Sequence, residues 1–307
     1  MDKPKFANIL FDETFKIVVG APGNEPLLIR LIEILIPGKK IRSLERLDKE
    51  NHGLVISDKN TTFDLFCTSE AGEQFIVEMQ FAEQETYRER MLFYATYPLR
   101  AQMDARLRAV ERLSGVTRDR MDYSLHPVYV LSMLNFSLPH EGDKALEEGL
   151  VSRYSIRNDG NGELMTDVLH FIYLELGRLE RKKGEEALCR TPLERLAYSL
   201  KYMHLLDERP RSFDDEFQQM LFTATELAGM TQEQRQEYDK TMTTKIDIIE
   251  QQETARKRGL EEGMEKGLEK GRQEERVATA KRLRELGVSP DIIAQATGMS
   301  VEEINAL

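Results

Sequence analysis

Two acidic residues, Asp64 and Glu78, lie in neighbouring segments with alternating apolar letters, "TTFDLFCT" at 61–68 and "EQFIVEMQF" at 73–81. Alternation with a period of two predicts strands, because successive side chains on a strand point to opposite faces. On the second segment Phe75, Val77 and Met79 would share an apolar face. Glu78 and Gln80 would share the other. A half-buried strand with one wet face explains this pattern too, so any chemistry at Glu78 depends on what lies opposite it.

The turn between the two segments decides which residue faces Glu78. A two-residue loop at Ala71 and Gly72 would pair residues whose numbers sum to 143 and would set Asp64 opposite Met79. A three-residue loop, Glu70 to Gly72, gives pairs that sum to 142 and sets Asp64 opposite Glu78, with Gly72 in the left-handed region. We expect the second arrangement. Directly opposed side chains are about 5 Å apart at Cβ, so two carboxylates there repel unless a cation or a proton intervenes.

Such a carboxylate pair is a candidate seat for Mg²⁺, which prefers oxygen ligands and retains several waters. The structural alternative is an ordinary pair of strand-surface acids. The rest of the sequence provides no competing metal site, since the five histidines show neither an HxH nor an HExxH spacing. Cys67 and Cys189 lie far apart and indicate neither a disulfide framework nor a zinc site, so we expect inert thiols.

The elements around the pair predict an α/β domain. The segment "PGNEPLLIRLIEILIPG" shows a helical apolar period, and short strands are expected at about 41–48, 61–68 and 73–81. A helix is expected from about 84 to 112, with a kink or break at Pro98, and "HPVYVLSML" at 126–134 reads as a buried strand. The order α, β, β, β, α, β predicts a mixed sheet covered by helices over roughly residues 1–135.

Four segments in this order resemble the PD-(D/E)XK nuclease superfamily, and within it the Rpn-type recombination-promoting nucleases and transposases. They are "FDETFKIVVG" at 11–20, "TTFDLFCTSEAGEQFIVEMQ" at 61–80, "YRERMLFYATYPLRAQ" at 87–102 and "HPVYVLSMLNF" at 126–136. The resemblance implies a restriction-endonuclease-like αβββαβ core with a helical C-terminal extension. It also implies a metal-dependent DNA endonuclease.

By this resemblance Asp64 and Glu78 would be the metal ligands, with the carbonyl of Met79 as a further ligand and Mg²⁺ or another divalent cation as cofactor. Asp64, Glu78 and Gln80 would form the catalytic set. Gln80 stands where the family commonly has lysine, and other members of the superfamily resemble this chain in carrying the E-x-Q form. An amide can orient water but cannot supply a positive charge or exchange a proton at neutral pH.

Five further residues are accessory candidates. Arg90, Tyr94 and Gln102 are spaced four and eight apart, so a helix would align them roughly on one face, toward the site or the DNA. A structural role explains them equally well. Asp12 and Lys16 match the early family motif, and an ion pair between residues i and i+4 of one helix is the alternative.

The remainder of the chain shows organisation without identifiable chemistry. We predict a nuclease-like core with additional strands over 1–180 and a helical region over 181–250. A charged, glycine-repeat helix or linker with a short helical tail is expected over 251–307. Two strands are expected around residues 159–162, and amphipathic helices at 191–206 and 214–229.

The tail carries a glycine every fourth position, Gly259, Gly263, Gly267 and Gly271. Each costs a helix roughly 1 kcal/mol relative to alanine, which favours a flexible charged linker over a packed helix. The final repeat, "GVSPDII" and "GMSVEEI", predicts short helices with a capping box at Ser300 and Glu303. These helices resemble a helix-turn-helix fragment but are acidic, which favours a small interaction tail.

Charge and hydropathy limit the kinds of partner that we expect. The net charge of −11 argues against general nucleic-acid binding, yet Arg100 to Arg120 contains six arginines and three acids, either a solvated helix face or a phosphate-attracting patch. No apolar run is long enough to span a membrane, and the N-terminus lacks a secretory apolar core, so the cytoplasm is the expected location.

We therefore expect a Mg²⁺-dependent DNA endonuclease associated with recombination or mobile elements. The alternative is a catalytically weak or inactive nuclease-fold protein that binds DNA or protein. A purely structural role through the C-terminal helices is a third interpretation. DNA is the expected partner, with no membrane partner, and the C-terminal helices could form a homo-oligomer.

Overall fold

The computed structural model describes residues 4–46, 63–112, 122–139 and 149–307, and it separates into two compact units, Met1–Thr241 and Met242–Leu307. The first unit contains the sheet and the helices around it. The second contains most of the last long helix and two short ones. The boundary between the units falls inside helix α7. The division of the chain at 180 and 250 stays a prediction.

A six-stranded sheet with the order β1-β2-β3-β4-β6-β5 forms the centre of the first unit. Its strands are β1 (Leu44–Arg46), β2 (Leu65–Ser69), β3 (Gln74–Gln80), β4 (Val128–Leu134), β5 (Val151–Ser155) and β6 (Leu169–Glu175). β3 and β4 are parallel, as are β4 and β6, whereas the other neighbours are antiparallel. All seven residues of β4 are buried, which accounts for its almost uninterrupted apolar sequence.

The β2–β3 hairpin has the predicted register. Leu65 pairs with Val77 and Phe66 with Ile76, so paired numbers sum to 142. Gly72 closes the three-residue turn with φ of +80°, in the region that side chains with a Cβ disfavour. The strands predicted at 41–48 and 61–68 correspond to β1 and β2. Residues 47, 48, 61 and 62 of these two predictions lie outside the described residues.

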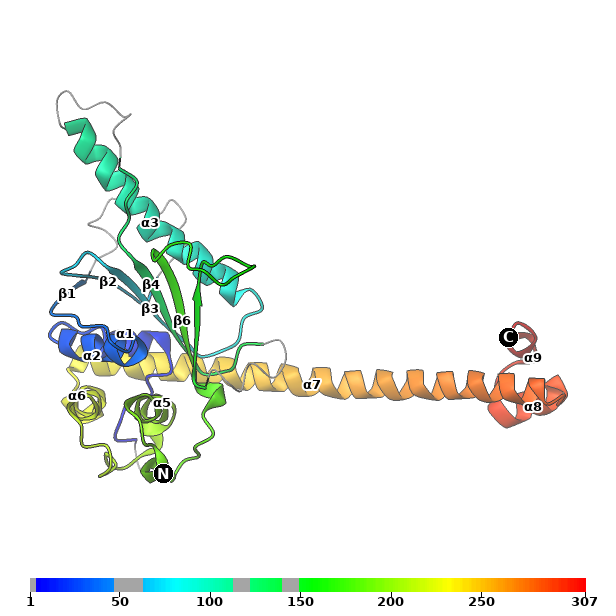
Figure 1. Cartoon of the computed structure of the whole chain (residues 1–307). Helices are drawn as coiled ribbons and strands as arrows, with labels where there is room; N and C mark the ends of the chain where they lie inside the picture. The colour runs from blue at the N-terminus through cyan, green and yellow to red at the C-terminus, as the bar shows by residue number, and fades with distance from the viewer. Residues whose placement is uncertain (1–3, 47–62, 113–121, 140–148) are drawn as a thin grey trace. The chain divides into compact units, whose positions relative to one another are not determined.

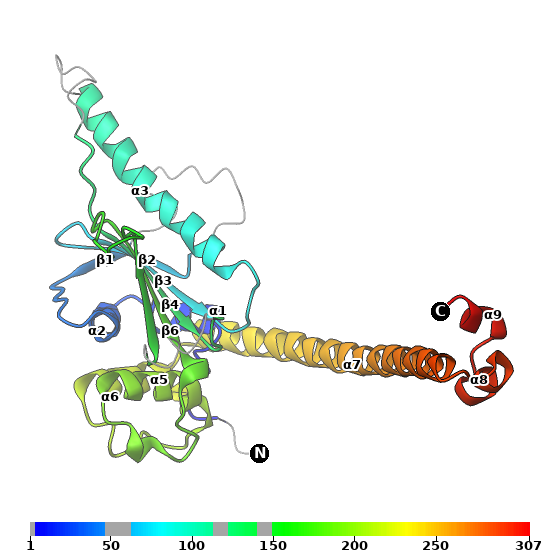
Figure 2. The same cartoon turned by 45° about the vertical axis from the view of Figure 1, so that its right-hand side comes forward.

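Helices cover both faces of the sheet (Figures 1 and 2). α3 (Tyr87–Arg112) packs on one face, where its residues join a core with Ile76, Val130 and Tyr173. α1 (Asp12–Val18) and α2 (Glu25–Leu35) lie on the other side. The chain therefore begins with two helices where the sequence pattern predicted one. Apart from this extra helix, the predicted αβββαβ order is confirmed.

Pro98 does not break α3, which continues on both sides of it. A proline removes one backbone hydrogen bond, here to the carbonyl of residue 94. Tyr94 and Ala95, in the turn that loses this bond, are buried in the core against the sheet. Tertiary packing therefore holds the helix together across the missing bond. Of the predicted kink or break, the break was wrong and the kink stays a prediction.

The predicted hairpin around residues 159–162 and the two later helices are also present. β5 and β6 pair antiparallel, with a further bridge between Arg157 and Leu164.

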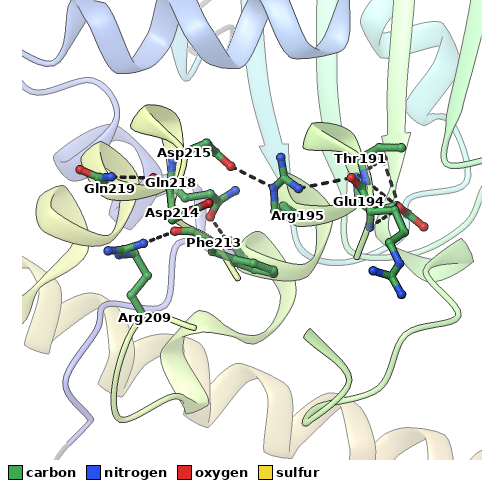
Figure 3. Close-up of polar contacts among 11 residues, drawn as sticks. Thr191, Glu194, Arg195, Arg209, Phe213, Asp214, Asp215, Gln218 and Gln219 are labelled. Atoms are coloured by element: carbon green, nitrogen blue, oxygen red, sulfur yellow. Dashed lines mark hydrogen bonds and ion pairs between the residues drawn. The ribbon is translucent and has the colours of Figure 1, made fainter. Parts of the chain in front are cut away.

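α5 (Pro192–Tyr202) begins with a capping box, Thr191 and Glu194, and α6 (Glu216–Thr225) is capped by Asp215. Arg195 pairs with Asp215 at 2.9 Å and so joins the two helix starts (Figure 3). Four single-turn 3₁₀ helices complete this part, at Leu176–Arg178, Glu186–Leu188, Met203–Leu205 and Leu227–Gly229.

The glycine-punctuated segment is helical. α7 runs without interruption over Gln232–Glu285, so the flexible-linker interpretation is wrong. α8 (Pro290–Thr297) and α9 (Val301–Asn305) follow, and Ile293, Met299 and Ile304 form a small buried core with Ala280 of α7. The predicted capping box at Ser300 and Glu303 is confirmed. Among the described residues, no helix is both long and apolar enough to cross a membrane.

Candidate active site

The hairpin register brings the carboxylates of Asp64 and Glu78 side by side. The backbone N–H of Asp64 donates to Glu78 Oε1 at 3.1 Å, and the N–H of Met79 donates to Asp64 Oδ2 at 2.8 Å. Each acid is therefore held by the backbone of the opposite segment. This reciprocal arrangement follows from pairing that sums to 142 and would be lost with a one-residue slip.

The pair is buried rather than wet. Glu78 is 5% exposed, and the Asp64 side chain is also 5% exposed. Burial raises the pKa of Asp64, although Lys16 opposes this effect. Burial and the neighbouring charge of Asp64 together raise the pKa of Glu78 well above its usual value. The wet-face interpretation of β3 was wrong, because α3 covers the face that carries Glu78.

Lys16 provides the nearest positive charge. Its Nζ lies 2.9 Å from Asp64 Oδ1, and about a third of the side chain is exposed. Burial lowers the pKa of Lys16, but the attraction of Asp64 outweighs this effect and the pKa is raised overall. Asp12, one turn earlier on α1, is close enough to raise the pKa of both Lys16 and Asp64. The N-terminal helix thus contributes both of its accessory candidates to the site.

Arg90 and Tyr94 reach the same region from α3, whereas Gln80 comes from β3. Arg90 Nη2 donates to Gln80 Oε1 at 2.6 Å, and Gln80 Nε2 donates to the carbonyl of Ala82 at 2.8 Å. The Arg90 guanidinium also lies over the ring of Tyr94, 5.7 Å from its centroid. The positive charge of Arg90 lowers the pKa of Glu78, opposing burial. The amide of Gln80 is therefore engaged in positioning Arg90.

Gln102 does not join these residues. Its side chain donates to Gln74 Oε1 at 2.8 Å and accepts from the N–H of His126 at 2.7 Å. Gln74 opens β3 and Gln80 ends it, a separation of roughly 20 Å along the strand. Gln102 thus ties α3 to the beginnings of β3 and β4.

Two residues that sequence patterns did not select lie beside the pair. Ser132 is the direct neighbour of Glu78 across the parallel strands, on the same face, and Tyr87 packs into the same core. Ser132 Oγ, Tyr87 Oη and Arg90 Nε are buried without a hydrogen-bond partner in the described structure. The signal for Ser132 was its position as the one small polar residue in the apolar run "VYVLSML".

The residues present fit a hydrated divalent cation. Two adjacent carboxylates with raised pKa values would be relieved by a positive charge, and Mg²⁺ commonly uses one or two carboxylates plus water. The unpartnered polar atoms nearby could bond such waters. Among the described residues, no group of three or more His, Cys, Asp or Glu side chains is placed to hold a metal. The predicted ligand role of the Met79 carbonyl stays a prediction.

The arginine-rich segment is partly described. Arg100, 84% exposed, pairs with Asp104 at 3.8 Å, and Arg106 pairs with Asp122 at 3.2 Å. Arg118 and Arg120 belong to residues 113–121, which lie outside the described part of the chain. The phosphate-attracting role of this segment stays a prediction.

Comparison with protein families gave a match over residues 9–255 to the model described as PD-(D/E)XK nuclease family transposase. The match includes the sheet, α1 to α6 and the beginning of α7, and so covers every residue of the site. Searches of curated proteins and of solved structures gave no match.

Proposed function

Because the chain belongs to the PD-(D/E)XK nuclease family of transposases, we propose that it hydrolyses phosphodiester bonds of DNA, with a divalent cation held by Asp64 and Glu78. The observation that carries this proposal is the reciprocal pairing of two buried acids across one hairpin. Keeping two carboxylates together away from water is unfavourable unless a cation or proton compensates. Mg²⁺ is the cation that the oxygen ligands favour.

When bound, the cation would lower the pKa of a water ligand and stabilise charge on the scissile phosphate. The residues of the chain have separate tasks. Asp64 and Glu78 would hold the ion, with the Met79 carbonyl as a third ligand. Lys16 neutralises Asp64 and, since it is partly exposed, can turn toward an incoming phosphate.

On the other side, Gln80 holds Arg90 in place. Arg90 in turn moderates the charge of Glu78 and lies over Tyr94. In this proposal Gln80 acts as a positioning residue. Positive charge that the commoner motif lysine would supply comes from Lys16 and Arg90, on the two helices that flank the hairpin.

A second candidate function is binding of DNA or protein without catalysis. The observation in its favour is that Lys16 already compensates Asp64 at 2.9 Å, so the fold can accommodate the acid without a metal. The engaged amide of Gln80 also favours this candidate.

Plasmid nicking by the full chain separates the two candidates. We expect nicking in Mg²⁺ that EDTA abolishes, and loss of nicking in Asp64→Asn and Glu78→Gln. These isosteres keep the acceptors for Met79 N–H and Asp64 N–H, so circular dichroism should show unchanged folding. A matched control is Asp104→Asn, an exposed acid on α3. Nicking by the two site variants at the wild-type rate would refute the assignment, and DNA binding without nicking would support the second candidate.

We further propose a cytoplasmic location and self-association through α7. Leu260, Met264 and Leu268 follow one another every four residues on that helix and are 64%, 68% and 59% exposed. Side chains at this spacing share one helix face. The glycines beside them would allow a second helix to approach closely, and the surrounding charges of both signs would suit an identical partner.

A further inference from the structure

A cavity of about 740 Å³ lies between the loop after α2 and the β5–β6 hairpin. Two of the residues that line it, Tyr129 and His170, belong to the row Phe75, Tyr129 and His170, which are direct neighbours on β3, β4 and β6. Phe75 and Glu78 are three residues apart on one strand, so this row lies on the sheet face opposite the carboxylates. We call the cavity the basic pocket. None of the residues that line it belongs to the candidate active site.

Positive charge exceeds negative charge in the basic pocket. Its two acids are engaged, since Glu73 pairs with Lys39 at 2.6 Å and Asp167 pairs with His170 at 3.0 Å. The remaining charged residues of the lining are all cationic, namely Lys40, Arg153 and Arg157. Within the described part of the chain, no carboxylate lies within ion-pair distance of these three. The pocket therefore carries surplus charge suited to an anion.

Arg153 contributes to this surplus of positive charge, because no carboxylate in the described part of the structure neutralises its guanidinium. Its guanidinium donates to the carbonyl of Leu35 at 3.0 Å, which fixes its direction without neutralising it. Burial lowers its pKa, and no acid opposes that effect. Arg157 is held in a similar way, by Ser155 Oγ and the carbonyl of Gly162, each at 2.9 Å. Both guanidiniums are thus oriented by neutral acceptors, which leaves their charge available to a ligand.

Tyr129 and His170 line the pocket as part of a stack of flat rings, with the buried Phe75 behind Tyr129. Phe75 and Tyr129 are 5.2 Å apart and Tyr129 and His170 are 4.7 Å apart, both pairs nearly parallel at 12°. Lys39 lies 4.8 Å from the Tyr129 ring centroid and donates to its hydroxyl. Ring stacks beside cations are the means by which proteins bind nucleobases and their phosphates.

A neighbouring cavity of about 510 Å³ shares Pro37, Lys40 and Arg153 with the basic pocket, but its own arginines are neutralised. Arg195 pairs with Asp215 (Figure 3), and Arg30 pairs with Glu33 and Glu216. Lys40 and Arg153 thus lie where the two cavities meet, and Arg157 adds a third unneutralised cation in the basic pocket alone.

We propose that the basic pocket binds the phosphate of a nucleotide, with Arg153, Arg157 and Lys40 as its anion ligands and the ring stack ending in His170 as the wall for the base. A cavity of this size is within the range of small-ligand sites. The nucleotide could be free or part of a nucleic-acid chain, since the phosphate chemistry is the same. This site goes beyond the proposed nuclease function, because it requires neither Asp64 nor Glu78.

Calorimetric titration of the full chain in EDTA tests the proposal with four probes: inorganic phosphate, adenosine monophosphate, adenosine and a short single-stranded DNA oligonucleotide. We expect adenosine monophosphate to bind, phosphate to compete with it, and adenosine to bind at least about tenfold more weakly. Competition by the oligonucleotide would support a strand-borne phosphate, and its failure to compete would support a free nucleotide.

Variants locate the site. Arg153→Gln and Arg157→Gln should each weaken binding of adenosine monophosphate by about tenfold or more. Arg211→Gln, the same charge change at an exposed arginine that lines neither cavity, should leave it unchanged. If Arg153→Gln fails to fold, Lys40→Gln removes an exposed charge from the same pocket. The proposal is overturned if no probe binds, if adenosine binds as tightly as its phosphate, or if the pocket variants behave like Arg211→Gln.

Discussion

At the scale of single residues, Glu78 is a proposed metal ligand whose ionised form is unfavourable in the folded protein. Its raised pKa, caused first by burial and then by Asp64, means that the folded protein prefers the protonated acid. The resulting stability is fully present below the pKa that Glu78 has in the unfolded chain. It is lost as pH rises through the pKa that Glu78 has in the folded protein. A cation at the site would return part of this stability, because it favours the ionised form.

The pH dependence of unfolding tests this description of Glu78. In EDTA, Glu78→Gln should gain stability relative to the wild type as pH rises from about 5 to about 8, measured by urea unfolding. Glu70→Gln should instead differ from the wild type by a constant amount over this range, and the difference should shrink only as pH falls below about 4.5. Backbone N–H groups of Arg42, of Glu70 itself and of Ser43 lower the pKa of Glu70, so its contribution is lost as pH falls. A pH-independent difference between wild type and Glu78→Gln would contradict the burial argument.

The contact with Arg90 explains why position 80 carries a glutamine rather than a lysine. A lysine at this position would place an ammonium beside the Arg90 guanidinium, which now lies 2.6 Å from the amide oxygen. We expect Gln80→Lys to destabilise the fold by about 1–2 kcal/mol through like-charge repulsion and a lost hydrogen bond. Arg90→Met should remove most of that penalty, so a double-mutant cycle of urea unfolding measures the coupling. Strict additivity of the two changes would show that Arg90 does not determine the residue at 80.

Sequence patterns predicted part of this site. The alternation on the two strands and the glycine in the turn placed Asp64 opposite Glu78, because register follows from local geometry. They could not show that α3 buries Glu78, that Lys16 contacts Asp64, or that Gln102 turns to Gln74. Those contacts depend on how helices pack on the sheet, and a helical face has several directions in which it can meet a partner.

At the scale of elements, the β2–β3 turn determines the site. Gly72 needs its positive φ, and an added Cβ would lie 2.8 Å from the His126 ring. Gly23 has a φ of +90° but open space around it. Gly72→Ala should therefore cost more stability than Gly23→Ala, which should cost about 1 kcal/mol from backbone strain alone. Urea unfolding of both variants measures the difference. Equal costs would show that the contact with His126 does not constrain the turn.

Element prediction failed where local propensity was weighed in isolation. The four glycines suggested a linker, yet α7 continues through them, because a helix already formed on both sides propagates at little further cost per residue. Pro98 was expected to interrupt α3 for a similar reason, but packing on the sheet holds that helix. At Pro98, packing outweighed about 3 kcal/mol of local preference, whereas along α7 the neighbouring helical residues compensate roughly 1 kcal/mol at each glycine.

At the scale of the whole molecule, the family match ends at residue 255 and the first compact unit at Thr241, and we predict that residues after about 250 are separable from the nuclease fold. Tyr238 Oη accepts from the N–H of Asn8, so the beginning of α7 must be retained. A chain ending at Glu250 should keep the unfolding transition of the first unit and lose self-association. Calorimetry and light scattering against the full chain check both expectations. Loss of the transition would show that the first unit requires the second.

The central claim is that Asp64 and Glu78 hold one divalent cation. Binding of Mn²⁺, followed by electron paramagnetic resonance of the full chain, tests it without depending on substrate or turnover. We expect one Mn²⁺ per chain, displaced by Mg²⁺, with binding weakened at least about tenfold in Asp64→Asn and in Glu78→Gln. Asp104→Asn should bind as the wild type does. Unchanged Mn²⁺ affinity and stoichiometry in both site variants would contradict the claim.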